Sequence, residues 1–153
     1  MDKKITSYFL KLLRSKSKYA RGHVVYTYDD ENYYLCDGYF LRAVKKEEME
    51  LNINLFKETK SLNEVLEGVK DEKYKEAKIK YYVPDKYNKG KFIIKIANKE
   101  TKAYINSKYL ELFKDCTKFK IISELKAVVC LKEEKDKEIF LGLIMPIRVE
   151  EEY

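Results

Sequence analysis

The chain has 153 residues, of which 45% are hydrophobic and 38% are charged. This is the length of one domain, with enough apolar side chains to bury a core under a densely charged surface, which excludes a disordered chain. No apolar run approaches the roughly 20 residues that cross a bilayer, and the first residues lack the apolar centre of a signal peptide. The three cysteines, Cys36, Cys116 and Cys130, do not form the pattern of a disulfide framework. We therefore expect a single cytoplasmic domain over residues 1–153, with no membrane contact.

The net charge of +6 is concentrated in one segment. The first 22 residues hold seven basic and one acidic side chain, and taking these from the totals of 32 and 26 leaves 25 of each sign. The abundance of lysine, tyrosine, isoleucine, asparagine and glutamate is what A+T-rich coding DNA would give, and this bias explains much of the lysine content. It does not explain why the excess charge lies in a single segment.

The first predicted element is an amphipathic helix over residues 3–16, with Asp2 as its N-cap. Its apolar positions recur at i, i+3, i+4, i+7 and i+8: Ile5, Tyr8, Phe9, Leu12 and Leu13. At about 100° per residue, four basic side chains gather on the opposite face, and we call them the basic ridge: Lys4, Lys11, Arg14 and Lys18. The pattern predicts a helix with one side in a core and a positive side facing out.

Three strands and a helical segment are expected next. The strands are the β-branched and aromatic stretches at residues 23–28, 33–36 and 39–46, which predict an antiparallel meander. The pair Asp37-Gly38 is a turn signal between the second and third strands. A capping box, Ser-Leu-Asn-Glu at residues 61–64, then begins a pattern of helical spacing. We therefore expect a helical segment within residues 55–80.

The last part of the chain repeats the order of helix and strands. A turn at residues 88–90 precedes a strand at 92–96, and a short strand at 102–105 leads into a helix that Asn106 caps and that runs to about Cys116. Further strands are expected at residues 119–123, 125–131 and 138–144, with residues 147–149 extending the last one after a break at Met145 and Pro146.

Four stretches carry a family pattern in a fixed order. The helix at residues 3–16 is followed by Cys-Asp-Gly-Tyr-Phe-Leu-Arg at 36–42, Asn-Ser-Lys-Tyr-Leu at 106–110 and Leu-Ile-Met-Pro-Ile-Arg at 143–148. Together they resemble one domain of the bacterial DNA sliding clamp, the DNA polymerase III beta subunit family. The resemblance covers residues 1–50 and 101–149. It implies an α+β fold with two helices packed on a curved antiparallel sheet, and an insertion at about residues 55–90.

The resemblance also implies two binding sites and self-association. In the family, helix lysines face duplex phosphates without reading sequence, which here assigns DNA binding to the basic ridge. Partner peptides enter an apolar groove, and the matching positions in this chain are Gly38, Leu41, Met145, Pro146 and Arg148. A clamp ring contains about six such domains, so single-domain chains would have to form a homo-oligomer.

Simpler interpretations stay open for both sites. The basic ridge is equally compatible with a solvated helix face that has no ligand. The groove positions are equally compatible with plain packing of strand ends, and Tyr39 and Phe40 would then fill the space of the groove.

The sequence offers little for catalysis or metal binding. His23 is the only histidine, no Cys/His spacing fits zinc, and five scattered glycines make no phosphate loop. We therefore expect no enzyme, no cofactor and no metal site. A carboxylate enzyme stays open, because acids from distant strands can meet in a pocket that raises their pKa. The interleaving at Tyr81-Tyr82 and Lys86-Tyr87 suits stacking on single-stranded bases, although compositional bias accounts for it as well.

These expectations favour a non-catalytic, clamp-like module in DNA replication, a processivity factor that binds the duplex backbone, replication-protein peptides or both. The alternative is a phage or mobile-element factor that uses a clamp-like domain as an inhibitor or adaptor of a host protein. Such a factor would not bind DNA, and residues 55–80 would make the contact. Solution mass and salt-sensitive DNA binding discriminate between the two.

Overall fold

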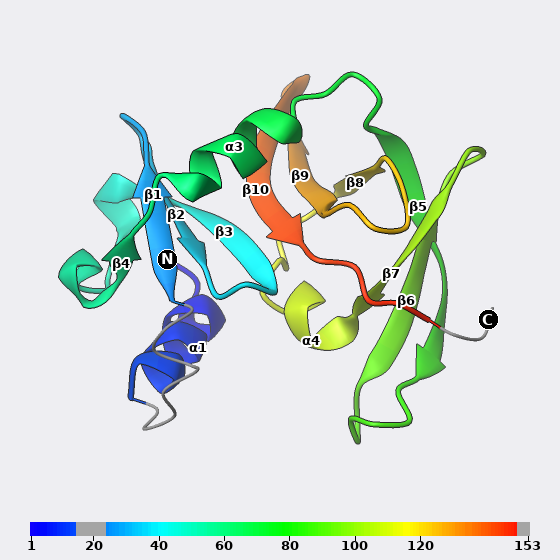
Figure 1. Cartoon of the computed structure of the whole chain (residues 1–153), viewed down its shortest axis with the longest axis horizontal. Helices are drawn as coiled ribbons and strands as arrows, with labels where there is room; N and C mark the ends of the chain where they lie inside the picture. The colour runs from blue at the N-terminus through cyan, green and yellow to red at the C-terminus, as the bar shows by residue number, and fades with distance from the viewer. Residues whose placement is uncertain (15–23, 150–153) are drawn as a thin grey trace. The chain divides into compact units, whose positions relative to one another are not determined.

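The computed structural model describes residues 1–14 and 24–149, which form a mixed α+β structure with mainly antiparallel strands (Figure 1). The chain divides into two compact units, Met1–Gly68 and Val69–Tyr153, which we call unit 1 and unit 2. The boundary falls inside the segment that was expected to be an insertion.

In residues 1–14 and 24–68, the described part of unit 1, strands β1 to β4 lie in the sequence between helices α1 and α3. Its elements are α1 (Lys3–Arg14), β1 (Val25–Tyr28), β2 (Asn32–Cys36), β3 (Phe40–Lys45), β4 (Lys57–Glu58) and α3 (Ser61–Gly68). Two short 3-10 turns, Lys46–Glu48 and Ile53–Leu55, connect β3 to β4. The strand order is β4-β1-β2-β3, with the β1–β4 pair parallel and the others antiparallel. The predicted meander is thus confirmed within the described residues.

Helix α1 forms for the reasons the sequence predicts. The Asp2 carboxylate accepts a hydrogen bond from the Lys4 amide at 2.7 Å, which caps the helix. Ile5 and Phe9 are buried, and the Phe9 ring lies 5.5 Å from both Phe40 and Phe56. Burying one such aromatic side chain contributes about 1.5–3 kcal/mol, so this cluster holds α1 on the strands of unit 1.

The turn between β2 and β3 is held by a buried carboxylate. One oxygen of Asp37 accepts from the amides of Tyr39 at 2.8 Å and Phe40 at 3.1 Å, and the other accepts from the Tyr8 hydroxyl at 2.6 Å. Gly38 has φ +96°, a conformation that other residues rarely adopt. The Asp-Gly turn is confirmed, and it also ties the turn to α1.

The described part of unit 2, residues 69–149, contains six strands that pair antiparallel. Its elements are β5 (Lys75–Pro84), β6 (Phe92–Ala97), β7 (Lys102–Asn106), α4 (Ser107–Leu110), β8 (Lys118–Ile121), β9 (Val128–Glu134) and β10 (Lys137–Ile144). The strand order is β10-β9-β8-β5-β6-β7. After Pro146 the chain lies beside β7, where the Ile147 amide donates to the Tyr104 carbonyl at 2.8 Å.

The expected helical segment at residues 55–80 is wrong over its second half. Helix α3 ends at Gly68, and residues 75–84 form β5. In β5 the more buried positions alternate with exposed ones from Ala77 onward, as in a strand, although the register with β6 shifts between Ile79 and Tyr81. With so many charged residues between them, these few apolar positions fitted a helical period as well as a strand period.

The expected helix from Asn106 to Cys116 is much shorter in the structure. The Asn106 cap is confirmed, because its side chain accepts from the Lys108 amide at 2.9 Å, but α4 ends at Leu110. Three-residue turns follow, in which the amides of Leu112 and Phe113 donate to the carbonyls of Tyr109 and Leu110. These turns bury Leu112 and Phe113 without a longer helix.

Two smaller expectations about the last strands are also wrong. The strand expected at residues 125–131 begins only at Val128, and residues 147–149 are not a strand. β9 runs to Glu134, and the turn that joins it to β10 consists of Lys135 and Asp136, both with positive φ.

Candidate functional site

The basic ridge lies on the solvent side of α1. Lys4, Lys11 and Arg14 are exposed, and Lys3 is exposed beside them, whereas Ile5 and Phe9 on the opposite face are buried. Lys18 lies outside the described residues. The helix contains no acidic residue, and no ion pair to Lys3, Lys4, Lys11 or Arg14 is found within residues 1–14 and 24–149. The described part of the ridge is therefore an uncompensated positive surface.

The order of charges along α1 is only partly explained by helix stability. Arg14 and Lys11 lie in the last turn, where positive charge interacts favourably with the helix dipole. Lys3 and Lys4 lie in the first turn, where a positive charge opposes the helix dipole and destabilises the helix by about 0.3–1 kcal/mol. Helix stability alone would therefore not favour lysines at this end.

The expected peptide groove is divided between the two units. Gly38 and Leu41 belong to unit 1, where Gly38 is exposed and Leu41 is buried in the core. Met145, Pro146 and Arg148 belong to unit 2, where Met145 and Arg148 are exposed and Pro146 is half-buried. Met145, Pro146 and Arg148 thus lie in the segment that runs beside β7. Gly38 lies in the β2–β3 turn and Leu41 follows it in β3.

Tyr39 and Phe40, the residues considered as groove fillers, separate in the structure. Phe40 is buried, with its ring 5.2 Å from Tyr8 and 5.5 Å from Phe9. Tyr39 is exposed. Phe40 therefore serves the core around α1, and Asp37 and Gly38 serve the turn, so packing accounts for this part of the family pattern.

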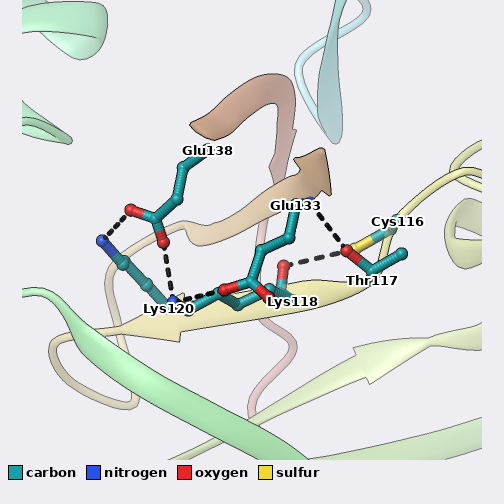
Figure 2. A network of polar contacts seen from close by, with 6 residues as sticks. All are labelled: Cys116, Thr117, Lys118, Lys120, Glu133 and Glu138. Atoms are coloured by element: carbon teal, nitrogen blue, oxygen red, sulfur yellow. Dashed lines mark hydrogen bonds and ion pairs between the residues drawn. The ribbon is translucent and has the colours of Figure 1, made fainter. Parts of the chain in front are cut away.

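The structure shows a polar network on unit 2 that the sequence did not reveal (Figure 2). Lys118 on β8 lies 3.0 Å from Glu133 and 2.8 Å from Glu138, and Lys120 lies 2.8 Å from the other oxygen of Glu138. Hydrogen bonds from Lys118 and then Lys120 hold the pKa of Glu138 below its ordinary value. Glu138 and Glu133 together raise the pKa of Lys118. Both shifts favour the charged forms of Glu138 and Lys118, so these ion pairs tie β8 to β9 and β10.

An open depression on unit 2 also contains carboxylates. Its lining includes Asp71, Glu72 and Glu76, which are interleaved with Lys70, Lys75 and Lys120. Three lysines therefore stand among the three carboxylates of this lining. This depression offers no specific support for a carboxylate enzyme.

Among the described residues, no three His, Cys, Asp or Glu side chains are grouped in a way that could hold a metal ion. No described helix has the length and apolar character needed to cross a membrane. Cys36, Cys116 and Cys130 are free thiols, and His23 lies outside the described residues.

The lysine–tyrosine stretch at residues 81–87 occupies the β5–β6 hairpin. Tyr82 and Tyr87 are exposed, whereas Tyr81 is half-buried with the Lys95 ammonium 5.3 Å from its ring centre. The interleaving therefore gives two exposed rings and one that is partly covered by a neighbouring strand.

Comparisons with protein-family models, with curated proteins and with solved structures found no match for this chain. The resemblance to a sliding-clamp domain consequently depends on the short stretches quoted above.

Proposed function

We propose that this chain is a non-catalytic module that holds duplex DNA by its phosphates, through the basic ridge of α1, in the manner of one sliding-clamp domain. The observation that carries the proposal is the exposed, acid-free face of α1 with Lys4, Lys11 and Arg14. Lysine and arginine on a helix surface contact phosphates without reading bases, which gives affinity that depends on salt and not on sequence. A cytoplasmic location is part of the proposal, and three free thiols are compatible with a reducing compartment.

The helices of this chain would share the DNA contact unequally. α4 has four residues and includes one lysine, Lys108, whereas α1 has twelve residues and a continuous basic face. DNA contact would therefore rely on α1 in each copy of the chain. Encircling a duplex would require several copies, so the clamp-like form of the proposal includes a homo-oligomer.

The test is duplex binding by a charge-reversed variant, Lys11→Glu/Arg14→Glu. If each ridge side chain releases the counterions of one phosphate, it adds about 0.9 to the steepness with which the logarithm of the association constant falls with the logarithm of salt concentration. At roughly 0.1 M salt, one decade below about 1 M, each such contact then strengthens binding about eightfold. Losing two contacts should weaken binding about sixtyfold in a fluorescence anisotropy titration with a random-sequence duplex. Both side chains are exposed, so the variant should keep the circular dichroism of the parent protein.

The matched control is Lys60→Glu/Lys73→Glu, which changes the net charge by the same amount at exposed lysines elsewhere. The proposal expects this control to bind duplex nearly as well as the parent. Equal weakening of the two variants would show that only net charge matters, and unchanged binding by the α1 variant would leave the ridge as solvated surface.

The second candidate is a protein-interaction factor, phage or mobile-element in origin, that does not bind DNA. The observation in its favour is the exposed Met145 beside Pro146, because methionine adapts its shape to varied apolar partners. Light scattering separates the candidates: the clamp-like proposal expects a defined oligomer, whereas this candidate is compatible with a monomer that shows no duplex binding.

A further inference from the structure

The β5–β6 hairpin of unit 2 presents aromatic rings to solvent. Tyr82 is 55% exposed, Phe92 is 43% exposed, and Tyr87 in the connecting turn is 93% exposed. The rings of Tyr82 and Phe92 lie 6.5 Å apart and nearly perpendicular. Large apolar side chains that gather on one exposed surface are uncommon unless they contact a ligand.

A β-bulge creates this aromatic pair. Ile79 pairs with Ile96, but Tyr81 pairs with Lys95 and Tyr82 with Ile94, so β5 has one extra residue at Lys80. Side chains alternate between faces, so without the bulge Ile79 and Tyr82 would lie on opposite faces. With it, Tyr82 joins the face of Ile94 and Ile96 and reaches Phe92 on the neighbouring strand.

The hairpin is also strongly basic. Between residues 78 and 95 there are six lysines and one acid, Asp85. Four of the lysines are exposed, two before Tyr82 in the sequence and two between Tyr82 and Phe92: Lys78, Lys80, Lys86 and Lys89. This local excess of five positive charges was hidden in the sequence by acidic residues elsewhere in the chain.

Asp85 and Lys91 are used to fix the hairpin tip. Asp85 accepts from the Tyr87 amide at 3.0 Å and from the side chains of Asn88 at 2.7 Å and Asn106 at 2.8 Å. These bonds, first that of Asn88, hold the pKa of Asp85 below its ordinary value. Lys91 lies 3.2 Å from Glu111. The tip is therefore anchored to β7 and to the residues after α4, which presents the rings and lysines on a rigid support.

We propose that the β5–β6 hairpin binds single-stranded nucleic acid, with bases stacked on Tyr82 and Phe92 and phosphates held by lysines such as Lys80 and Lys89. Aromatic rings stack on any base, and lysines follow the backbone, so this combination binds single strands with little sequence preference. Duplex DNA keeps its bases stacked inside the helix and cannot use the rings in this way. This site is separate from the ridge of α1, and its ligand is different.

Unit 1 also has a cluster of aromatic rings that could stack on bases, but the charges around this rival cluster suit a phosphate backbone less well. Tyr26, Tyr28 and Tyr33 lie within 6.5 Å of one another by ring centres, with Lys46 4.7 Å from the Tyr28 ring. The turn that joins β1 and β2 contains Asp29, Asp30 and Glu31. Three carboxylates beside one lysine repel phosphates, whereas the hairpin attracts them.

The experiment measures the affinity of a fluorescein-labelled oligothymidine for the full chain and three variants. Tyr82→Ala/Phe92→Ala should weaken binding about tenfold or more, because stacking of one base on one ring supplies a large part of single-strand affinity. Lys80→Ala/Lys89→Ala should lower the slope of log K against log salt by about 1.4, at about 0.7 per phosphate. Tyr28→Ala is the matched control in the rival cluster and should bind as the parent does. All five side chains are exposed, and circular dichroism checks that each variant is folded.

Three results would overturn the proposal. One is the absence of oligothymidine binding at low salt. Another is unchanged affinity in Tyr82→Ala/Phe92→Ala, with or without an effect of the lysine variant, because the surface would then only attract polyanions. The third is a loss in Tyr28→Ala as large as that in the hairpin variant. The ridge variant Lys11→Glu/Arg14→Glu, measured with the same oligothymidine, keeps this test apart from duplex binding and should stay within about threefold of the parent.

Discussion

Replacing Tyr8 with phenylalanine removes the hydroxyl that joins α1 to the buried carboxylate of Asp37. That hydroxyl donates to Asp37 at 2.6 Å, and Asp37 is only 6% exposed. A hydrogen bond to a charged, buried acceptor contributes about 1.5–3 kcal/mol, and its loss leaves a desolvated carboxylate oxygen with a missing donor. The variant should therefore lower the free energy of unfolding by about 2 kcal/mol.

The measurement is urea unfolding followed by circular dichroism. With a slope near 2 kcal/mol per molar urea, a loss of about 2 kcal/mol moves the midpoint down by about 1 M. Tyr87→Phe is the control, because this tyrosine is 93% exposed and its hydroxyl is hydrated, so its midpoint should not move. A double-mutant cycle with Asp37→Asn isolates the pair and should give a coupling of about 1 kcal/mol. Equal midpoints for the two tyrosine variants would refute the view that this bond fixes α1 and its basic face.

Two further predictions concern unit 2. Glu138→Gln should lower the free energy of unfolding by about 1 kcal/mol in low salt and by less in high salt. The reason is that the Glu138 carboxylate pairs with both Lys118 and Lys120 at 2.8 Å. The control is Glu134→Gln, whose carboxylate lies 3.5 Å from Lys132, and this variant should lower the free energy of unfolding less. The pKa of Glu138 is lowered in the folded state, so the stability that its ion pairs contribute is complete above pH 4.5, the ordinary pKa, and is lost as the pH falls through the folded pKa. A difference in unfolding free energy between parent and variant that does not change with pH would contradict the assignment. The hydrogen bond from Cys130 lowers the pKa of Cys116 to about 7 despite partial burial, while burial raises that of Cys36, so iodoacetamide should modify Cys116 first with a rate midpoint near that pH. Mass spectrometry of peptides measures the two rates, and faster modification of Cys36 than of Cys116 would contradict this prediction.

Local signals account for the parts of the fold that the sequence predicted well. Asp2 and the spacing of Ile5 and Phe9 are enough to begin α1 and to choose its buried side. The same spacing argument correctly predicted that Lys4, Lys11 and Arg14 would be exposed. Asp37-Gly38 predicted a turn because few other pairs fit a positive φ at the second position.

The parts that were missed depend on contacts between distant residues. β5 could not be recognised from Lys75 to Lys80 alone, because its strand character comes from pairing with β6 and β8. Lys118 and Glu138 are twenty positions apart and meet only because β9 lies between their strands. The aromatic pair on the hairpin depends on the bulge at Lys80, and simple alternation would place Tyr82 on the other face.

The central claim, that the ridge of α1 holds duplex phosphates, is tested most directly by the salt dependence of duplex binding. The parent protein and a neutral variant, Lys11→Ala/Arg14→Ala, are titrated with the same duplex over a series of salt concentrations. Two lost phosphate contacts should make the slope of log K against log salt shallower by about 1.8. The same slope in both proteins would mean that these side chains release no counterions, and duplex DNA would then not be the ligand of this surface.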